Sequence, residues 1–198
     1  MEMHRTAVVI ALLLVLCCTK VQADSWAAAT AQARASENGQ FVVRVVPGVS
    51  KGDVVGIAGE PKGRYASAEW HKFNGKAYQK MATAVLLNPI APVDIEVTND
   101  GMLITFDNWH NRGIGSVVVL YKPDGTIFKK YTLQDLYSKS DLARINTSVS
   151  SINWRCSGFS TSLEPRNQLW IDDSLGGRFE FDLKSGRFDY QRGGGTCR

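Results

Sequence analysis

The sequence lacks a hydrophobic run long enough to cross a membrane. Its one unbroken apolar stretch extends from Ala7 to Cys18, whereas a spanning helix needs about 20 residues. The stretch follows Arg5 and precedes Val21-Gln22-Ala23, a pattern typical of a leader with a processing site. We therefore expect a signal peptide over residues 1–23 and export of residues 24–198 as a single β-rich domain, to the periplasm or as a secreted protein.

An excess of charge of one sign is also missing. The chain has 23 Lys and Arg residues against 19 Asp and Glu residues, and removal of Glu2, Arg5 and Lys20 with the leader lowers the net charge from +4 to +3. Lys129-Lys130 is the one adjacent basic pair. This pattern predicts no nucleic-acid partner. A protein or a component of the cell envelope remains possible as a partner, and the oligomeric state stays open.

Cysteine and histidine are scarce. Two of the four cysteines lie in the leader, which leaves Cys156 and Cys197 for one disulfide in an oxidising compartment. The sequence contains no Cys-x-x-Cys motif, the spacing typical of a redox pair. Only His71 and His110 remain after residue 23, and no Asp-x-Asp-x-Asp-Gly calcium loop is present. The sequence therefore predicts no metal site and no cofactor.

What the sequence does contain is a series of β-favouring segments with a period of two. These predict a mostly β fold, an antiparallel meander of about eleven strands. The expected strands are 41–46, 66–73, 77–87, 93–97, 102–109, 116–121, 127–131, 149–154, 169–171, 178–182 and 187–190.

Turn and capping patterns lie between these segments. Asn74-Gly75, Asp100-Gly101, Pro123-Asp124-Gly125 and Ser185-Gly186 favour hairpins, because each supplies a residue that tolerates positive φ. Two capping boxes, Thr132 with Asp135 and Ser138 with Asp141, predict a helical insertion near 133–145. The alanine-rich segment after Ser25 predicts a short N-terminal helix that ends near Gly39.

Three segments carry a resemblance: Asn99–Asp107, Val118–Ile127 and Phe179–Phe188. They resemble the strands and turns of bacterial secreted β-propeller-like repeat proteins. The resemblance is architectural, carries no catalytic residue across and lacks a tryptophan-aspartate repeat. It implies about three blades of four strands, fewer than a small closed propeller has, so the array need not close and its sheet edges need cover. An antiparallel β-sandwich is the alternative.

Candidate chemistry lies at two predicted strand ends. Asp107 lies at the end of the expected strand 102–109 and His110 follows it, whereas Asp172 and Asp173 follow the expected strand 169–171. Carboxylates and an imidazole can serve general acid-base catalysis if they meet around one substrate. These four are candidate catalytic residues, although adjacent residues of an extended strand, such as Asp172 and Asp173, point to opposite faces.

The neighbours of His110 are candidate ligand-binding residues: Asn108, Trp109, Asn111 and Arg112. Loops at the ends of scaffold strands commonly hold such sites. We therefore expect an exported, non-enzymatic binding or interaction module that uses loops of a β scaffold. The alternatives are an extracytoplasmic hydrolase acting on an extracellular polymer and a small-ligand or metal-binding accessory protein.

Overall fold

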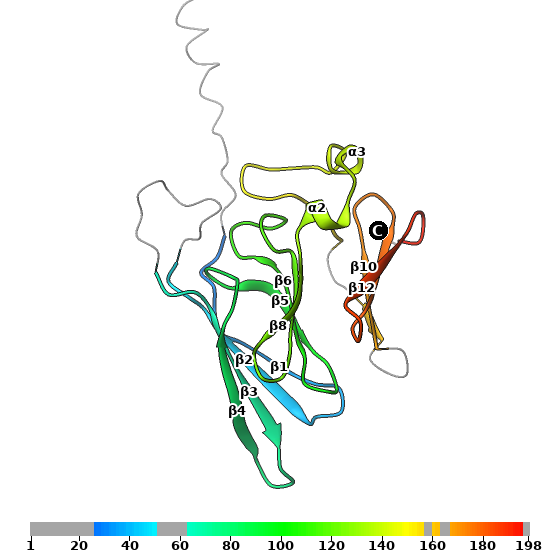
Figure 1. The fold of residues 1–198 in the computed structure, drawn as a ribbon. Coiled ribbons are helices and arrows are strands. Elements are labelled where there is room, and N and C mark those ends of the chain that lie inside the picture. The colour runs from blue at the N-terminus through cyan, green and yellow to red at the C-terminus, as the bar shows by residue number, and fades with distance from the viewer. Residues whose placement is uncertain (1–25, 51–62, 157–159, 163–166, 196–198) are drawn as a thin grey trace, which may run out of the picture.

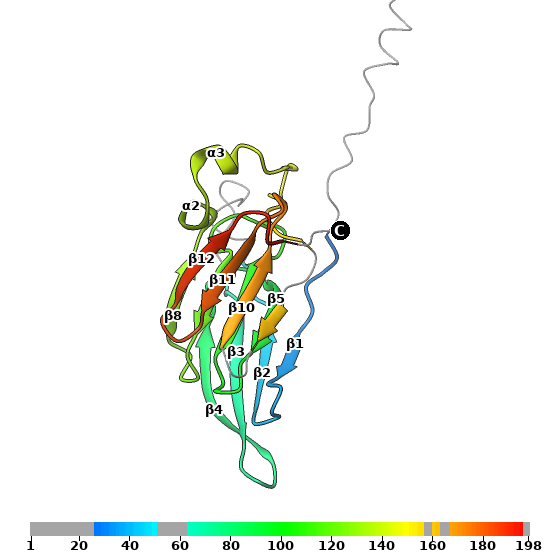
Figure 2. The ribbon, with the colours of Figure 1, turned by 90° about the vertical axis from the view of Figure 1, so that its right-hand side faces the viewer.

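The structure, a computed structural model, describes residues 26–50, 63–156, 160–162 and 167–195. Its strands form three antiparallel sheets of four strands each, shown in Figures 1 and 2. The mostly β fold and the three four-stranded meanders expected from the sequence are confirmed. The described strands follow a linear order in each sheet and form no closed ring.

The elements have the following bounds. Sheet 1 contains β1 (Gln32–Ala35), β2 (Phe41–Val46), β3 (Ser67–Phe73) and β4 (Tyr78–Val85). Sheet 2 contains β5 (Pro92–Val97), β6 (Leu103–Asn108), β7 (Val118–Tyr121) and β8 (Ile127–Tyr131). Sheet 3 contains β9 (Ser160–Ser162), β10 (Gln168–Asp172), β11 (Arg178–Asp182) and β12 (Arg187–Gln191), and α2 (Leu133–Leu136) and α3 (Lys139–Leu142) precede it.

The predicted glycine turns join the strands. Gly101, between β5 and β6, has a φ of +87°, and a Cβ there would lie 2.7 Å from the ring of Phe41. Gly125, between β7 and β8, has a φ of +84°. A side chain at either position would be strained in the backbone, so the hairpins depend on glycine at these turns.

Sheet 2 is the middle layer, and its two central strands are buried on both faces. All residues of β6 and β7 are buried. Leu103 and Val119 belong to the core shared with sheet 1, whereas Ile104 and Phe106 belong to the core shared with sheet 3. Since successive residues of a strand point to opposite faces, one continuous apolar strand can serve two cores.

Three aromatic side chains connect the sheets through hydrogen bonds. The Trp70 indole of β3 donates to the carbonyl of Gly101, at 3.1 Å. The Tyr121 hydroxyl accepts from the Leu87 amide at 2.8 Å, and the Tyr131 hydroxyl donates to the carbonyl of Gly186. Each aromatic ring thus adds apolar area to a core and satisfies its polar atom in a neighbouring layer.

The two outer faces of this stack are polar. On sheet 1, Glu69 lies 3.6 Å from the Arg44 guanidinium and 2.9 Å from the Lys80 ammonium. On sheet 3, Arg178 and Asp172 form an ion pair at 2.6 Å. A sheet whose second face carries charges packs on one side only, so the three sheets bury their apolar faces without a fourth sheet.

The expected N-terminal helix is wrong. Residues 26–31 have no regular structure, and Gln32–Ala35 form β1, which pairs antiparallel with β2. The alanine-rich composition favours a helix locally, but pairing with the edge of β2 supplies hydrogen bonds that a short isolated helix cannot match. By contrast, the helical insertion is confirmed, with the Thr132–Asp135 and Ser138–Asp141 caps in place.

The strand expected at 149–154 is also wrong. The Ser148 amide donates to the Ser151 carbonyl at 2.7 Å, which closes a turn with Val149 exposed at its tip. Sheet 3 begins instead with β9 at Ser160–Ser162. Within the described residues, no helix is long and apolar enough to cross a membrane.

Candidate functional site

Hydrogen bonds of two asparagines fix the conformation of the loop between β6 and β7. Asn108 donates from Nδ2 to the Ile114 carbonyl at 2.7 Å and accepts from Asn88 Nδ2 at 2.9 Å. The Asn111 amide donates to the Asn108 carbonyl at 2.9 Å. Both side chains are buried. The two asparagines, expected to bind a ligand, therefore lie beneath the loop surface; a ligand-binding role for them stays a prediction.

Asp107 is the buried centre of this region. Its φ is +54°, a left-handed conformation that Asp tolerates better than most residues. The carboxylate has no exposed surface and accepts hydrogen bonds from the Trp154 indole at 2.7 Å, from Arg155 Nε at 2.8 Å and from the Gly113 amide at 3.0 Å. These contacts join the end of β6 to a segment almost 50 residues later.

Two arginines balance this carboxylate. Arg155 also reaches Asp94 of β5 at 2.7 Å, and its guanidinium lies 5.5 Å from the centre of the Phe106 ring. Burial alone would lower the pKa of Arg155, but Asp107 and Asp94 outweigh burial and raise the pKa. Arg112 donates from Nη2 to the Arg155 carbonyl at 2.7 Å, and its Nε lies 3.9 Å from Asp107. Burial, together with Arg155, lowers the pKa of Arg112.

Asp173 forms a second buried carboxylate cluster, which the Tyr137 hydroxyl links to the Trp154 carbonyl. Oδ2 accepts from the hydroxyls of Tyr137 at 3.1 Å and Tyr190 at 2.8 Å, and Oδ1 accepts from two amides of the following turn. Burial, and then the bond to Asp173, raises the pKa of Tyr190 to about 12. Burial also raises the pKa of Tyr137 far above its ordinary value. Both tyrosines therefore stay protonated and serve as donors.

The other two candidate catalytic residues lie elsewhere. Asp172 faces outward on sheet 3, where Arg178 binds both of its carboxylate oxygens. His110 is exposed and stacks on the Trp26 ring, with 5.8 Å between ring centres. A different set of side chains therefore contacts each of the four candidate catalytic residues, Asp107, His110, Asp172 and Asp173. A catalytic role for any of them stays a prediction.

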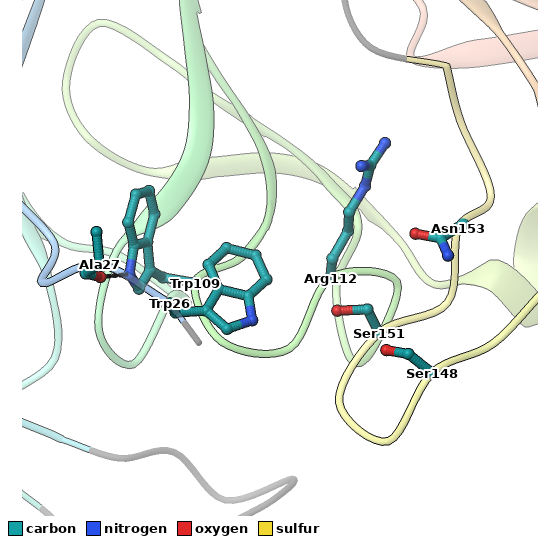
Figure 3. A pocket seen from close by; sticks show the side chains of 7 residues that line it. All are labelled: Trp26, Ala27, Trp109, Arg112, Ser148, Ser151 and Asn153. Carbon is teal, nitrogen blue, oxygen red and sulfur yellow. Dashed lines mark hydrogen bonds between the residues drawn. The ribbon is translucent and has the colours of Figure 1, made fainter. Parts of the chain in front are cut away.

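A pocket of about 500 Å³ opens beside this loop. Trp26 and Ala27 of the N-terminal segment and Trp109 of the β6–β7 loop line one side. Figure 3 shows Ser148, Ser151 and Asn153, from the turn after α3, on the other side, next to Arg112. The pocket therefore combines an aromatic wall with a wall of hydroxyl and amide groups.

The aromatic wall is itself an ordered cluster. The rings of Trp26 and Trp109 meet edge to face with 5.4 Å between their centres. Trp109 donates from its indole nitrogen to the Ala27 carbonyl at 2.9 Å. That bond satisfies the only polar atom of the Trp109 side chain, so the rest of the ring is an apolar surface at the pocket.

Sequence reasoning found two of the seven residues that line this pocket. Trp109 and Arg112 were expected to bind a ligand, and both line it. Trp26 was missed because it fell within the expected helix. Ser151 and Asn153 were missed because they fell within an expected strand. The signal that could have found them is the Ser148-Val149-Ser150-Ser151 run, whose small hydroxyl residues favour a turn over a strand interior.

The described residues contain no group of three or more His, Cys, Asp or Glu side chains that could hold a metal ion. Cys156 is disulfide-bonded. Its expected partner, Cys197, lies outside the described residues, as do residues 1–25, so the pairing and the signal peptide stay predictions.

Comparison with known proteins identifies no family. No protein-family model and no curated protein matches the chain. Among solved structures, a periplasmic gluconolactonase from Pseudomonas aeruginosa, PpgL, matches with a TM-score of 0.44 and 14% identity, over 80% of this chain and 41% of that one. HIRA(644-1017) matches with a TM-score of 0.39 and 9% identity, over 84% of this chain and 54% of that one. This chain thus spans about half or less of either protein, and neither likeness bears on its function.

Proposed function

We propose that this chain is an exported, non-enzymatic binding module that holds its ligand in the pocket between Trp26, Trp109 and the Ser148–Asn153 turn. The observation that carries the proposal is the meeting of three segments, distant in sequence, around this pocket. The β scaffold holds these segments in place. The buried Asp107 cluster holds Arg112, one of the residues that line the pocket. Preformed concave sites with aromatic walls and a few polar groups are the usual form of a ligand site.

The hydrogen bonds of the nearby carboxylates support binding over catalysis, because these bonds already occupy their oxygens. Asp107 is fully enclosed by donors, and Asp173 accepts from two tyrosines and two amides. A general acid or base must reach a proton of the substrate by hydrogen bonding. The pocket itself is lined by indole, hydroxyl, amide and guanidinium groups. Export rests on the leader expected at residues 1–23.

The test is a thermal-shift screen of the chain purified after secretion, with oligosaccharides, cell-wall fragments, peptides and divalent metals. A ligand at 100 times its dissociation constant should stabilise the protein by about 2.7 kcal/mol. We expect this stabilisation to fall to about 1.4 kcal/mol in Trp109→Ala, as for a tenfold weaker ligand, and to persist in Trp170→Ala, a matched control on the outer face of sheet 3. A shift of equal size in wild type and Trp109→Ala, or breakdown of the added polymer, would contradict the proposal.

A further inference from the structure

The polar wall of the pocket is neutral in its chemistry. Ser148, Ser151 and Asn153 offer hydroxyl and amide groups, which both donate and accept hydrogen bonds. The charged side chain nearby, Arg112, points its guanidinium away from the two serines (Figure 3). That guanidinium is bound to the Arg155 carbonyl and faces Asp107. One N–H of the Arg112 guanidinium is therefore bound within the buried cluster, and Asp107 lies near its charge.

The aromatic wall is rigid and largely apolar. His110 stacks on one face of Trp26 with an interplanar angle of 16°, so that this face of the indole is covered. Trp109 is fixed by its edge contact with Trp26 and by its bond to Ala27. Rings held in this way lose little conformational freedom when a ligand binds.

We infer that the pocket binds a neutral saccharide, an inference that rests on the proposed function and names its ligand class. A pyranose ring has an apolar face of C–H groups and a perimeter of hydroxyls. An indole can pack against such a face, and the serine and asparagine groups can exchange hydrogen bonds with such a perimeter. The volume of about 500 Å³ lies within the usual range for small-ligand sites.

A peptide ligand fits these observations less well. Extended peptides commonly bind by adding a strand to a free sheet edge, and acidic motifs bind to clusters of arginine. The pocket is lined by loops and by residues of the N-terminal segment that precede β1. Its arginine is already compensated by Asp107. Peptide binding is therefore the outcome that the experiment must be able to detect.

The experiment is affinity electrophoresis and calorimetry of the secreted protein with a soluble neutral β-glucan, a neutral galactomannan and, as the anionic counterpart, polygalacturonate. We expect a neutral polymer to bind and its affinity to be unchanged by salt, since no ion pair forms. Trp109→Ala should weaken binding about tenfold, Trp109→Phe less, and Asn153→Ala about fivefold, while Trp170→Ala should leave it unchanged.

The outcomes separate this inference from the proposed function. Binding of polygalacturonate alone, lost at high salt, would overturn the neutral ligand class but keep the pocket as the site if Trp109→Ala abolishes it. If the thermal-shift screen detects a peptide that needs Trp109, and no saccharide binds, the neutral saccharide is likewise overturned and the pocket remains the site. Saccharide binding that is equal in wild type and in folded Trp109→Ala would overturn both proposals.

Discussion

Asp107 shows at the scale of one residue how a carboxylate at a strand end can hold a fold together. It accepts from Trp154, Arg155 and the Gly113 amide with no exposed surface of its own. A buried charge is tolerated only when such partners compensate it. Removing the charge would leave the buried Arg155 and the partly buried Arg112 with only Asp94 as a counter-charge.

We therefore expect Asp107→Asn to lower the free energy of unfolding by about 3–5 kcal/mol, the usual cost of breaking a buried ion pair. Asparagine tolerates the left-handed φ of this position, so the loss reports the charge and not the backbone. Denaturant unfolding measures it. Asp172→Asn, which removes a more exposed partner of Arg178, is the matched control and should cost about 1 kcal/mol or less. Equal losses in the two variants would contradict the role given to Asp107.

The sequence located Asp107 correctly at a strand end but could not reveal its partners. Trp154 and Arg155 lie 47 and 48 residues later, and no local pattern joins positions that far apart. The expectation of acid-base chemistry at Asp107 therefore rested on residue type alone. Trp109 was a better candidate, because its place in a polar loop beyond β6 is a local property of the sequence.

At the scale of elements, the sequence predicted those that depend on hydrogen bonds between near neighbours and missed those that depend on pairing with distant residues. The Thr132–Asp135 pair was readable because a capping box uses residues three positions apart. Asp135 Oδ2 accepts from the Thr132 amide and hydroxyl, each at 2.7 Å. β1 was not readable, because its pairing with β2 overrides the helix propensity of its alanines.

The capping box gives a test with a defined pH dependence. Asp135→Ala should lower the free energy of unfolding by about 1 kcal/mol at pH 7, because two bonds at the start of α2 are lost. The hydrogen bond from the Thr132 amide, followed by that from its hydroxyl, lowers the pKa of Asp135. The stabilisation is thus complete above the ordinary value of 3.8 and is lost as the pH falls through the lower pKa of the folded state.

Unfolding followed by circular dichroism between pH 7 and pH 2 measures this difference. The stabilities of wild type and Asp135→Ala should converge at the acidic end. Asp189→Ala, a change of an exposed aspartate on β12, should have little effect at any pH. A difference between wild type and Asp135→Ala that does not shrink in acid would show that the carboxylate charge plays no part in the cap.

At the scale of the whole molecule, the stack of three sheets explains why a propeller-like sequence pattern need not close into a ring. The turns and the period of two were enough to predict antiparallel meanders, although they missed β1 and β9. The arrangement of the meanders follows from which faces are apolar. Sheets 1 and 3 each turn charged residues outward, such as Glu69 and Arg178, and each packs its other face on sheet 2. Sheet 2 therefore belongs to both cores.

A shared middle sheet predicts one cooperative unfolding transition. Leu103 and Ile104 are neighbours on β6, both with no exposed surface, yet Leu103 packs toward sheet 1 and Ile104 toward sheet 3. Replacing either by alanine should cost about 2–5 kcal/mol. If the two cores unfold together, each variant shifts the whole transition to a lower temperature.

Calorimetry of the Leu103→Ala and Ile104→Ala variants shows whether the protein unfolds in one transition or in two. Val85→Ala, which truncates an exposed side chain on β4, is the control. It should change the free energy of unfolding by no more than about 0.5 kcal/mol. A single transition, with calorimetric and van't Hoff enthalpies equal in both core variants, agrees with one unit. Two transitions, of which Leu103→Ala lowers one and Ile104→Ala the other, would mean that each core holds its own outer sheet.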